Sequence, residues 1–151
     1  MDVVNFIPDY PEIGPNIANE LYHKQEFYEN RLSAEPISLK GDLFPQQKVV
    51  GRFLSGQTPY TGLLVMHETG TGKTCAAFAA AEANRKYGKK VIFLAPNTGI
   101  LNQQKKELIE TCFPETYKSI SGKQRQRLTG YSFETVGTFA NSLNKKSARE
   151  I

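Results

Sequence analysis

Apolar runs alternate with helical patterns along the second part of the chain. Two short continuous runs, LLVM at 63–66 and VIFLA at 91–95, are typical of strands buried on both faces. The alanine-rich stretch 74–87 lies between them, and its composition favours a helix that packs closely on a sheet. Together these segments predict a βαβ unit with a right-handed crossover, and hence a parallel α/β sheet.

Spacing predicts further elements on both sides of this unit. A third strand is expected at 133–136, then a turn at Gly137 and a final helix from about Phe139. Pro114 ends the helix that follows the second strand. Three expected helices have a largely apolar face. In helix 16–32 it consists of Ile17, Leu21, Tyr28 and Leu32, and in the helix from Pro45 of Val49, Val50, Phe53 and Leu54. In the helix after the second strand it consists of Leu101, Gln104, Leu108 and Cys112. Residues 1–41 are expected to form an arm and a helix, and 42–151 a second unit.

The sequence HETGTGKT at 67–74, called the P-loop below, has the residues of a phosphate-binding turn. Gly70 and Gly72 allow positive φ and close approach of backbone N–H groups to phosphate. Lys73 can reach the β and γ phosphates, and the Thr74 hydroxyl can bind Mg²⁺. The helix that follows directs its N-terminus at the same point. We therefore expect nucleotide binding here, in preference to an ordinary glycine-rich turn.

His67 stands where the pattern G-x-x-x-x-G-K-[ST] has its first glycine. Two interpretations remain open. The residue either ends the preceding strand or senses the bound nucleotide.

Composition favours a globular, intracellular protein. The chain has 151 residues, of which 39% are hydrophobic, and no apolar run approaches a membrane span. The N-terminus lacks the basic and apolar regions of a signal peptide, so we expect a cytosolic or nuclear location and no membrane partner. Cys75 and Cys112 have neither a metal-binding spacing nor a disulfide framework, and are expected to be buried small hydrophobic residues.

Charge divides unevenly along the sequence. Residues 1–75 have six Lys/Arg and nine Asp/Glu, a net charge of −3, whereas residues 76–151 have thirteen and six, a net charge of +7. Lys123, Arg125 and Arg127 lie close together in an expected loop. The second half is therefore a candidate surface for a polyanion, with a merely solvated lysine-rich surface as the alternative.

Two more polar sites are candidates for ligand contacts because of their position in the sequence. Gln47 opens the helix that precedes the P-loop; its amide can match the donor and acceptor of an adenine edge, although a glutamine alone is more often on the surface. Pro96 to Gly99 follow the second expected strand. Ligands of open α/β sheets bind at such carboxyl ends of strands.

Four segments resemble, in this order, motifs of superfamily 2 helicases: the start of the helix that contains Gln47, HETGTGKT, VIFLAPNTGILNQQ and FETVGTF. They are similar to the adenine-recognition motif, motif I, motif Ia and the threonine-containing motif that follows, and cover Leu43 to about Asn141. FIPDYPEIG and RFLSGQTPYTGLLVMHETGTGKT are similar to helicase-like NTPases of nucleocytoplasmic large DNA viruses, including poxvirus transcription-associated NTPases. For a viral protein this implies the cytoplasm, a viral factory or the virion, and the viral transcription machinery as a further partner.

The resemblance implies a P-loop NTPase (RecA-like) parallel sheet flanked by helices, with 42–151 as the first part of the ATP-binding lobe. It implies ATP and Mg²⁺ as cofactors and DNA or RNA as partner. Implied cofactor contacts are Gln47, Glu68, Thr69, Gly70, Thr71, Gly72, Lys73 and Thr74, with Lys73 and Thr74 catalytic and Thr74 on Mg²⁺. Implied nucleic-acid backbone contacts are Pro96, Asn97, Thr98, Thr135 and Gly137.

One departure from the family pattern limits the expected activity. The acidic motif II box is absent, since no Asp follows Asp42, and so is the second lobe with its arginine fingers. We expect an incomplete sheet and the N-terminal portion of a helicase-type ATPase, either a fragment or a truncated gene, that is inactive alone. The alternatives are a non-catalytic remnant that binds nucleotide or nucleic acid and, more weakly, a P-loop kinase or GTPase.

Overall fold

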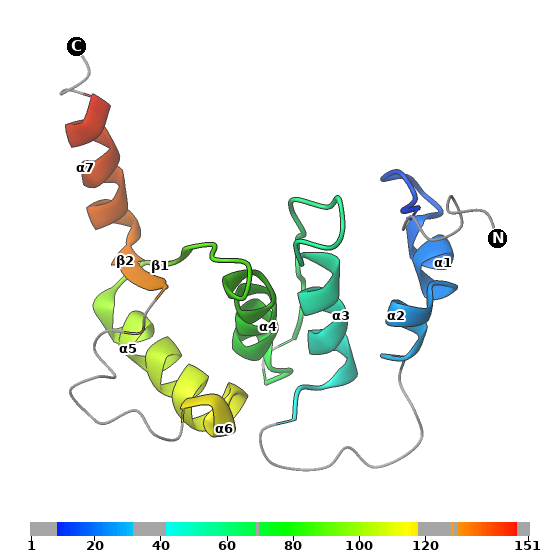
Figure 1. Ribbon diagram of the computed structural model, residues 1–151. Coiled ribbons are helices and arrows are strands. Elements are labelled where there is room, and N and C mark those ends of the chain that lie inside the picture. The colour runs from blue at the N-terminus through cyan, green and yellow to red at the C-terminus, as the bar shows by residue number, and fades with distance from the viewer. Residues whose placement is uncertain (1–8, 32–41, 69, 118–127, 129, 148–151) are drawn as a thin grey trace.

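The computed structural model describes residues 9–31, 42–68, 70–117, 128 and 130–147. In chain order its elements are α1 (Ile17–Tyr22), α2 (Gln25–Tyr28), α3 (Pro45–Phe53), α4 (Lys73–Arg85), β1 (Val91–Ala95), α5 (Thr98–Glu107), the π-helical turn η2 (Leu108–Cys112), α6 (Pro114–Tyr117), β2 (Tyr131–Thr135) and α7 (Val136–Ser147). Helix α4 lies centrally, between α3 and the β1–α5 segment (Figure 1).

β1 and β2 pair in parallel, which confirms a parallel α/β arrangement. The register runs from Val91 opposite Tyr131 to Ala95 opposite Thr135. β2 begins two residues before the expected strand and ends at Thr135. The Thr135 hydroxyl accepts a hydrogen bond from the Thr138 N–H and so caps α7. Helix α7 therefore starts at Val136, and the turn expected at Gly137 is wrong because Gly137 lies inside the helix.

The prediction of a buried strand at Leu63–Met66 is wrong. This segment has no sheet partner in the described part of the chain, and Leu64 and Met66 are each 84% exposed. A strand needs hydrogen bonds from a neighbour, and no described segment supplies them here. β2 pairs with β1 and not with this segment, so the described sheet lacks the 63–66 strand and is incomplete, as expected.

The main core lies where α4 packs against β1, η2 and β2. Phe78 on α4 and Leu108 on η2 are fully buried, and the Phe78 ring lies 4.5 Å from that of Phe93 on β1. Leu101, Leu108 and Cys112 are buried, which confirms the predicted stripe on α5 and its continuation. Pro114 follows the end of this helix as expected and begins α6.

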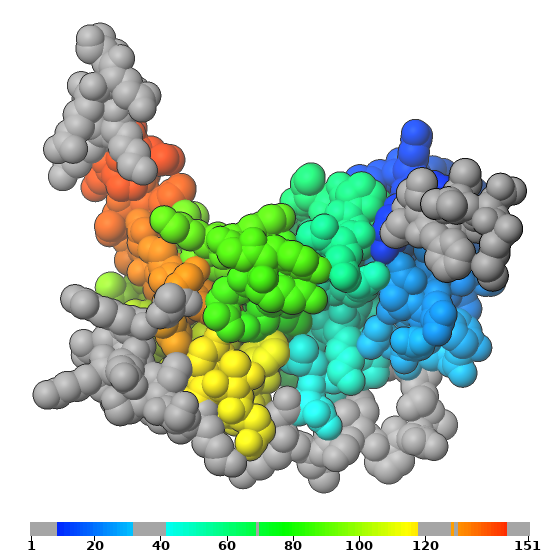
Figure 2. Space-filling model, viewed as in Figure 1, coloured from blue at the N-terminus to red at the C-terminus, as the bar shows by residue number. Residues whose placement is uncertain are grey.

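The N-terminal region forms two short helices, so the single helix predicted for 16–32 is wrong. Lys24 has extended backbone geometry (ψ 130°) and interrupts the helix after α1. Leu21, Phe27 and Tyr60 form a second core, with the Phe53 ring of α3 stacked on Tyr60. The two helices thus lie against α3, as Figure 2 shows by the contact of their blue surface with α3. The first eight residues of the expected arm and the linker 33–41 lie outside the described residues.

Cys75 and Cys112 form a disulfide bond, which corrects the expectation of two unpaired cysteines. Their Cα atoms are 5.2 Å apart, although 37 positions separate them in sequence. Packing of the first turn of α4 against η2 brings the two residues together. Local sequence spacing carries no signal of such a long-range pairing.

Candidate functional site

The P-loop turns through two glycines whose backbone conformation other residues rarely adopt. Gly70 has φ +86° and Gly72 has φ +81°. A Cβ atom on Gly72 would lie only 2.3 Å from the Gln47 Nε2 atom, whereas open space surrounds the same position on Gly70. Gly72 is thus required for the contact with α3, and Gly70 leaves the outer side of the loop free for a ligand.

The N-terminus of α4 has no side-chain cap. Among the described helices of eight residues or more, α5 and α7 each have a capping side chain that accepts a hydrogen bond from an N–H of the first turn, whereas α3 and α4 have none. The first N–H groups of a helix need partners, and together with the helix dipole they favour an anion. The structure therefore places a helix N-terminus that would suit an anion directly behind the two glycines.

Lys73 holds its positive charge at the same point. Its Nζ donates to the carbonyl oxygens of His67 and Glu68, at 3.0 and 3.1 Å. The Thr71 hydroxyl also donates to the Glu68 carbonyl, at 2.7 Å. These bonds close the loop around an exposed ammonium group. Thr74 lies half-buried in the first turn of α4, and Thr69 lies outside the described residues.

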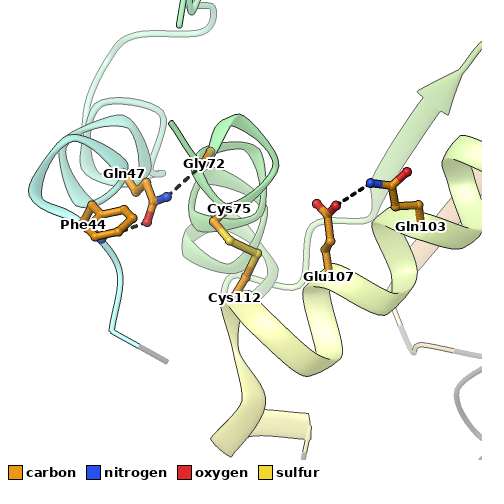
Figure 3. The surroundings of a disulfide bond; sticks show 7 residues. All are labelled: Phe44, Gln47, Gly72, Cys75, Gln103, Glu107 and Cys112. Atoms are coloured by element: carbon orange, nitrogen blue, oxygen red, sulfur yellow. Dashed lines mark hydrogen bonds between the residues drawn. A yellow bond between two sulfur atoms is a disulfide. The ribbon is translucent and has the colours of Figure 1, made fainter. Parts of the chain in front are cut away.

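Gln47 is buried, so its interpretation as a surface residue is wrong. Its side chain connects the start of α3 with the P-loop (Figure 3): Oε1 accepts from the Phe44 N–H at 2.8 Å, and Nε2 donates to the Gly72 carbonyl at 3.1 Å. Each of these amide atoms can make one more hydrogen bond. Gln47 therefore positions the P-loop, and its two amide atoms are not saturated by these bonds.

His67 ends no strand, because none precedes it. Its backbone carbonyl accepts from Lys73. Its ring Nδ1 atom is shielded from solvent and has no hydrogen-bond partner among the described residues. Sensing of a nucleotide by this ring stays a prediction.

A second group of predicted residues meets at the carboxyl ends of β1 and β2. Ala95 and Thr135 are opposite each other in the sheet, so the segments 96–98 and 136–138 leave the same edge. Asn97 Oδ1 accepts from the Ile100 N–H at 3.0 Å and caps α5, as Thr135 caps α7. The residues Pro96, Asn97, Thr98 and Gly137 are exposed. Two helix N-termini with polar caps thus lie side by side at the surface.

The P-loop and this sheet edge lie toward opposite ends of one helical rod. α5 has ten residues and η2 five, so the rod spans about 20 Å at 1.5 Å per residue. Thr98 begins the rod, and Cys112 at its other end is bonded to Cys75 in the first turn of α4. The structure therefore links the two groups without bringing them into contact.

Glu82 forms a polar cluster that sequence reasoning missed. Its carboxylate, on α4, pairs with Arg85 at 2.8 Å and accepts hydrogen bonds from the hydroxyls of Tyr117 and Tyr131. Burial favours the neutral carboxyl, but these hydrogen bonds outweigh it and lower the pKa of Glu82. Burial and the carboxylate raise the pKa of Tyr117 to about 12, and raise that of Tyr131 as well. The cluster ties α4 to α6 and β2.

Only some of the basic residues of the second half lie in the described part of the chain. Lys89 and Lys90, between α4 and β1, are exposed, and neither takes part in an ion pair with any residue that the structure describes. Lys123, Arg125 and Arg127 lie outside the described residues. No helix in the described ranges has the length and apolar character needed to cross a bilayer. No three His, Cys, Asp or Glu side chains in those ranges are grouped to hold a metal ion.

Comparison with known proteins identifies the family. Residues 23–151 match the family described as the type III restriction enzyme, res subunit. The chain belongs to this family. Its resemblance to helicase proteins of large DNA viruses is confirmed by the relatives below. No solved structure matches the chain.

Three similar proteins are viral. "Putative helicase 009L" of Frog virus 3 (isolate Goorha) is 36% identical over 122 residues, which cover 72% of this chain and 13% of that protein. "Putative helicase 087L" of Invertebrate iridescent virus 3 is 30% identical and covers 99% of this chain and 18% of that protein. "Putative ATP-dependent RNA helicase L377" of Acanthamoeba polyphaga mimivirus is 41% identical over 81 residues, 50% of this chain and 7% of that protein. The chain thus spans less than a fifth of the length of these relatives.

Proposed function

We propose that this chain is the ATP-binding portion of a superfamily 2 helicase or nucleic-acid-dependent ATPase, with a RecA-like fold. In the whole protein, ATP hydrolysis would be coupled to unwinding, translocation or viral transcription. The observation that carries this proposal is the uncapped N-terminus of α4 behind Gly70 and Gly72, with Lys73 held in the loop. Membership of the family supports the same assignment.

The residues of the P-loop fit a nucleoside triphosphate. Backbone N–H groups from Gly70 to Thr74 bind the phosphates, and Lys73 exchanges its two carbonyl partners for phosphate oxygens. Glu68 and Thr69 complete the loop, and Gln47 offers its remaining donor and acceptor to the adenine edge. The Thr74 hydroxyl holds Mg²⁺, which when bound neutralises charge on the β and γ phosphates. Lys73 and Thr74 are the residues proposed to act in catalysis.

The edge formed by β1 and β2 is the proposed nucleic-acid surface. Pro96, Asn97 and Thr98 at the start of α5, with Thr135 and Gly137 at the start of α7, would contact the phosphate backbone. Helix N-termini and polar side chains suit such contacts, which carry little sequence information. The proposal accordingly covers both RNA and DNA.

Lys73→Ala tests the nucleotide site. The variant loses a charge-assisted contact to phosphate, so we expect ATP–Mg²⁺ affinity to fall by about ten- to a hundredfold in calorimetric titration. Lys89→Ala is the matched control, because Lys89 is exposed and follows the C-terminal end of α4, whereas the P-loop precedes its N-terminal end. Equal ATP affinity of wild type and Lys73→Ala would refute a functional P-loop. Tighter binding of GTP than of ATP in the same calorimetric titration would favour a GTPase.

A second candidate is a non-catalytic chain that binds nucleotide or nucleic acid and regulates a partner. Within residues 1–151 no Asp follows Asp42, so these residues allow nucleotide binding to be tested apart from the acidic motif II box. We expect residues 1–151 to bind ATP but to show no nucleic-acid-stimulated phosphate release. Stimulated turnover in an assay with single-stranded DNA or RNA would show that the missing box is not needed.

A further inference from the structure

The disulfide bond lies directly beside the P-loop. Cys75 follows Lys73 and Thr74 in the first turn of α4, and its sulfur is bonded to Cys112 at the end of η2 (Figure 3). The first N–H groups of this turn are the ones left without a side-chain cap. The bond therefore fixes the proposed phosphate-binding turn to the far end of the α5–η2 rod.

The first turn of α4 is thus held from two sides. On one side, Gln47 of α3 donates a hydrogen bond to Gly72. On the other side, the bond to Cys112 is covalent, and Cys112 is 2% exposed in the main core with Phe78 and Leu108. A hydrogen bond opens and closes thermally, whereas the covalent bond releases the turn only when it is reduced. The disulfide bond consequently restricts the motion of this turn before a ligand arrives, and reduction would remove that restriction.

We propose that Cys75 and Cys112 form a reversible redox site that sets the affinity of the P-loop for ATP, with tighter binding in the disulfide form. This inference rests on the proposed nucleotide site. Reduction frees the turn, so part of the ordering must then occur on binding. Two thiols are small and apolar enough to stay in the same core, so the fold persists in the reduced form. Where thiols keep proteins reduced, disulfide bonds are mostly transient or redox-sensing, which suits this role.

The reaction is a thiol–disulfide exchange with a dithiol reductant. A reductant thiolate attacks Sγ of Cys75, which is half-buried and more accessible than Cys112. The S–S bond breaks, and Cys112 leaves as a thiolate that takes up a proton. The second reductant thiolate then attacks the mixed disulfide and releases Cys75, which is protonated in turn. The protein gains two electrons and two protons, and the reductant becomes a disulfide.

The test compares both redox states of residues 1–151. Thiol alkylation and mass spectrometry count no free cysteine before, and two after, treatment with dithiothreitol. Calorimetric titration with ATP and Mg²⁺ should show about fivefold weaker binding after reduction, a loss of the size that ordering one or two side chains costs. Hydrogen exchange, measured without nucleotide, should become faster at the amides of 70–76 and stay unchanged around Leu21 and Phe27. The double variant Cys75→Ser/Cys112→Ser should have the ATP affinity and exchange rates of the reduced protein, and dithiothreitol should change neither.

The outcomes separate this inference from the proposed function. Unchanged affinity and unchanged exchange at 70–76 after verified reduction would overturn the redox site, as would two free thiols in the untreated protein. Faster exchange at 70–76 with no ATP binding in either state would support redox control of the turn and refute the nucleotide site. If the double variant does not fold, the wild-type comparison still decides, because it needs no substitution.

Discussion

Replacing Gln47 tests whether this side chain holds the P-loop in place. Gln47→Ala removes the hydrogen bond from the Phe44 N–H and the one to the Gly72 carbonyl. Each hydrogen bond contributes about 1 kcal/mol net to stability. The Gly72 carbonyl keeps a second donor, the Ala76 N–H at 3.1 Å, whereas the Phe44 N–H loses its side-chain acceptor. The space left by a side chain that is 2% exposed adds about 1 kcal/mol. We therefore expect a loss of about 3 kcal/mol in unfolding free energy.

Urea unfolding followed by circular dichroism measures this loss, and Gln103→Ala is the matched control. Gln103 is exposed and donates to Glu107 one turn along α5 (Figure 3), a contact worth about 0.3 kcal/mol. Gln47→Glu separates the two bonds, because a carboxylate still accepts from Phe44 but offers Gly72 no donor. Because the new carboxylate oxygen is buried and faces the Gly72 carbonyl oxygen, we expect Gln47→Glu to lower the unfolding free energy more than Gln47→Ala does. Equal unfolding free energies for Gln47→Ala and Gln103→Ala would refute the assigned role.

Two further predictions concern pH and salt. Because the pKa of Glu82 is lowered in the folded state, its stabilising effect is present above its ordinary value of about 4.5 and is lost as pH falls through the folded pKa. Glu82→Gln should therefore lose less stability than wild type in urea unfolding between about pH 6 and pH 3, and parallel curves would contradict this. The chain should bind single-stranded nucleic acid weakly, with an affinity that falls steeply as salt rises. Fluorescence anisotropy that gives one affinity at low and high salt would argue against phosphate contacts.

Elements set by local pattern could be predicted from sequence. The β1 run, the α4 alanine stretch and the stripe on α5 each carry their own period, and all three formed close to the expected bounds. The two glycines of the P-loop also took the positive φ that their chemistry predicts. In each case the information lies within about fifteen neighbouring residues.

Features that depend on distant segments could not be predicted. Leu63–Met66 has the composition of a strand, but a strand forms only beside a partner. The pairing of Cys75 with Cys112 depends on how α4 meets η2. Burial of Gln47 likewise depends on where α3 lies against the P-loop, and a single glutamine has no local sign of it. The helix break at Lys24 was hidden because apolar spacing continued across it.

The exposed segment Leu63–Met66 has a thermodynamic consequence for the whole chain. Leu63, Leu64 and Met66 are exposed in this segment, and Ile92 and Leu94 are exposed on β1. Water ordered on these apolar surfaces is released when any polypeptide covers them, which lowers the heat capacity of the system. Association through this surface, with itself or with another chain, therefore has a negative heat-capacity change and strengthens on warming from near-freezing temperatures. Any self-association through this surface should therefore be weaker in the cold than at room temperature.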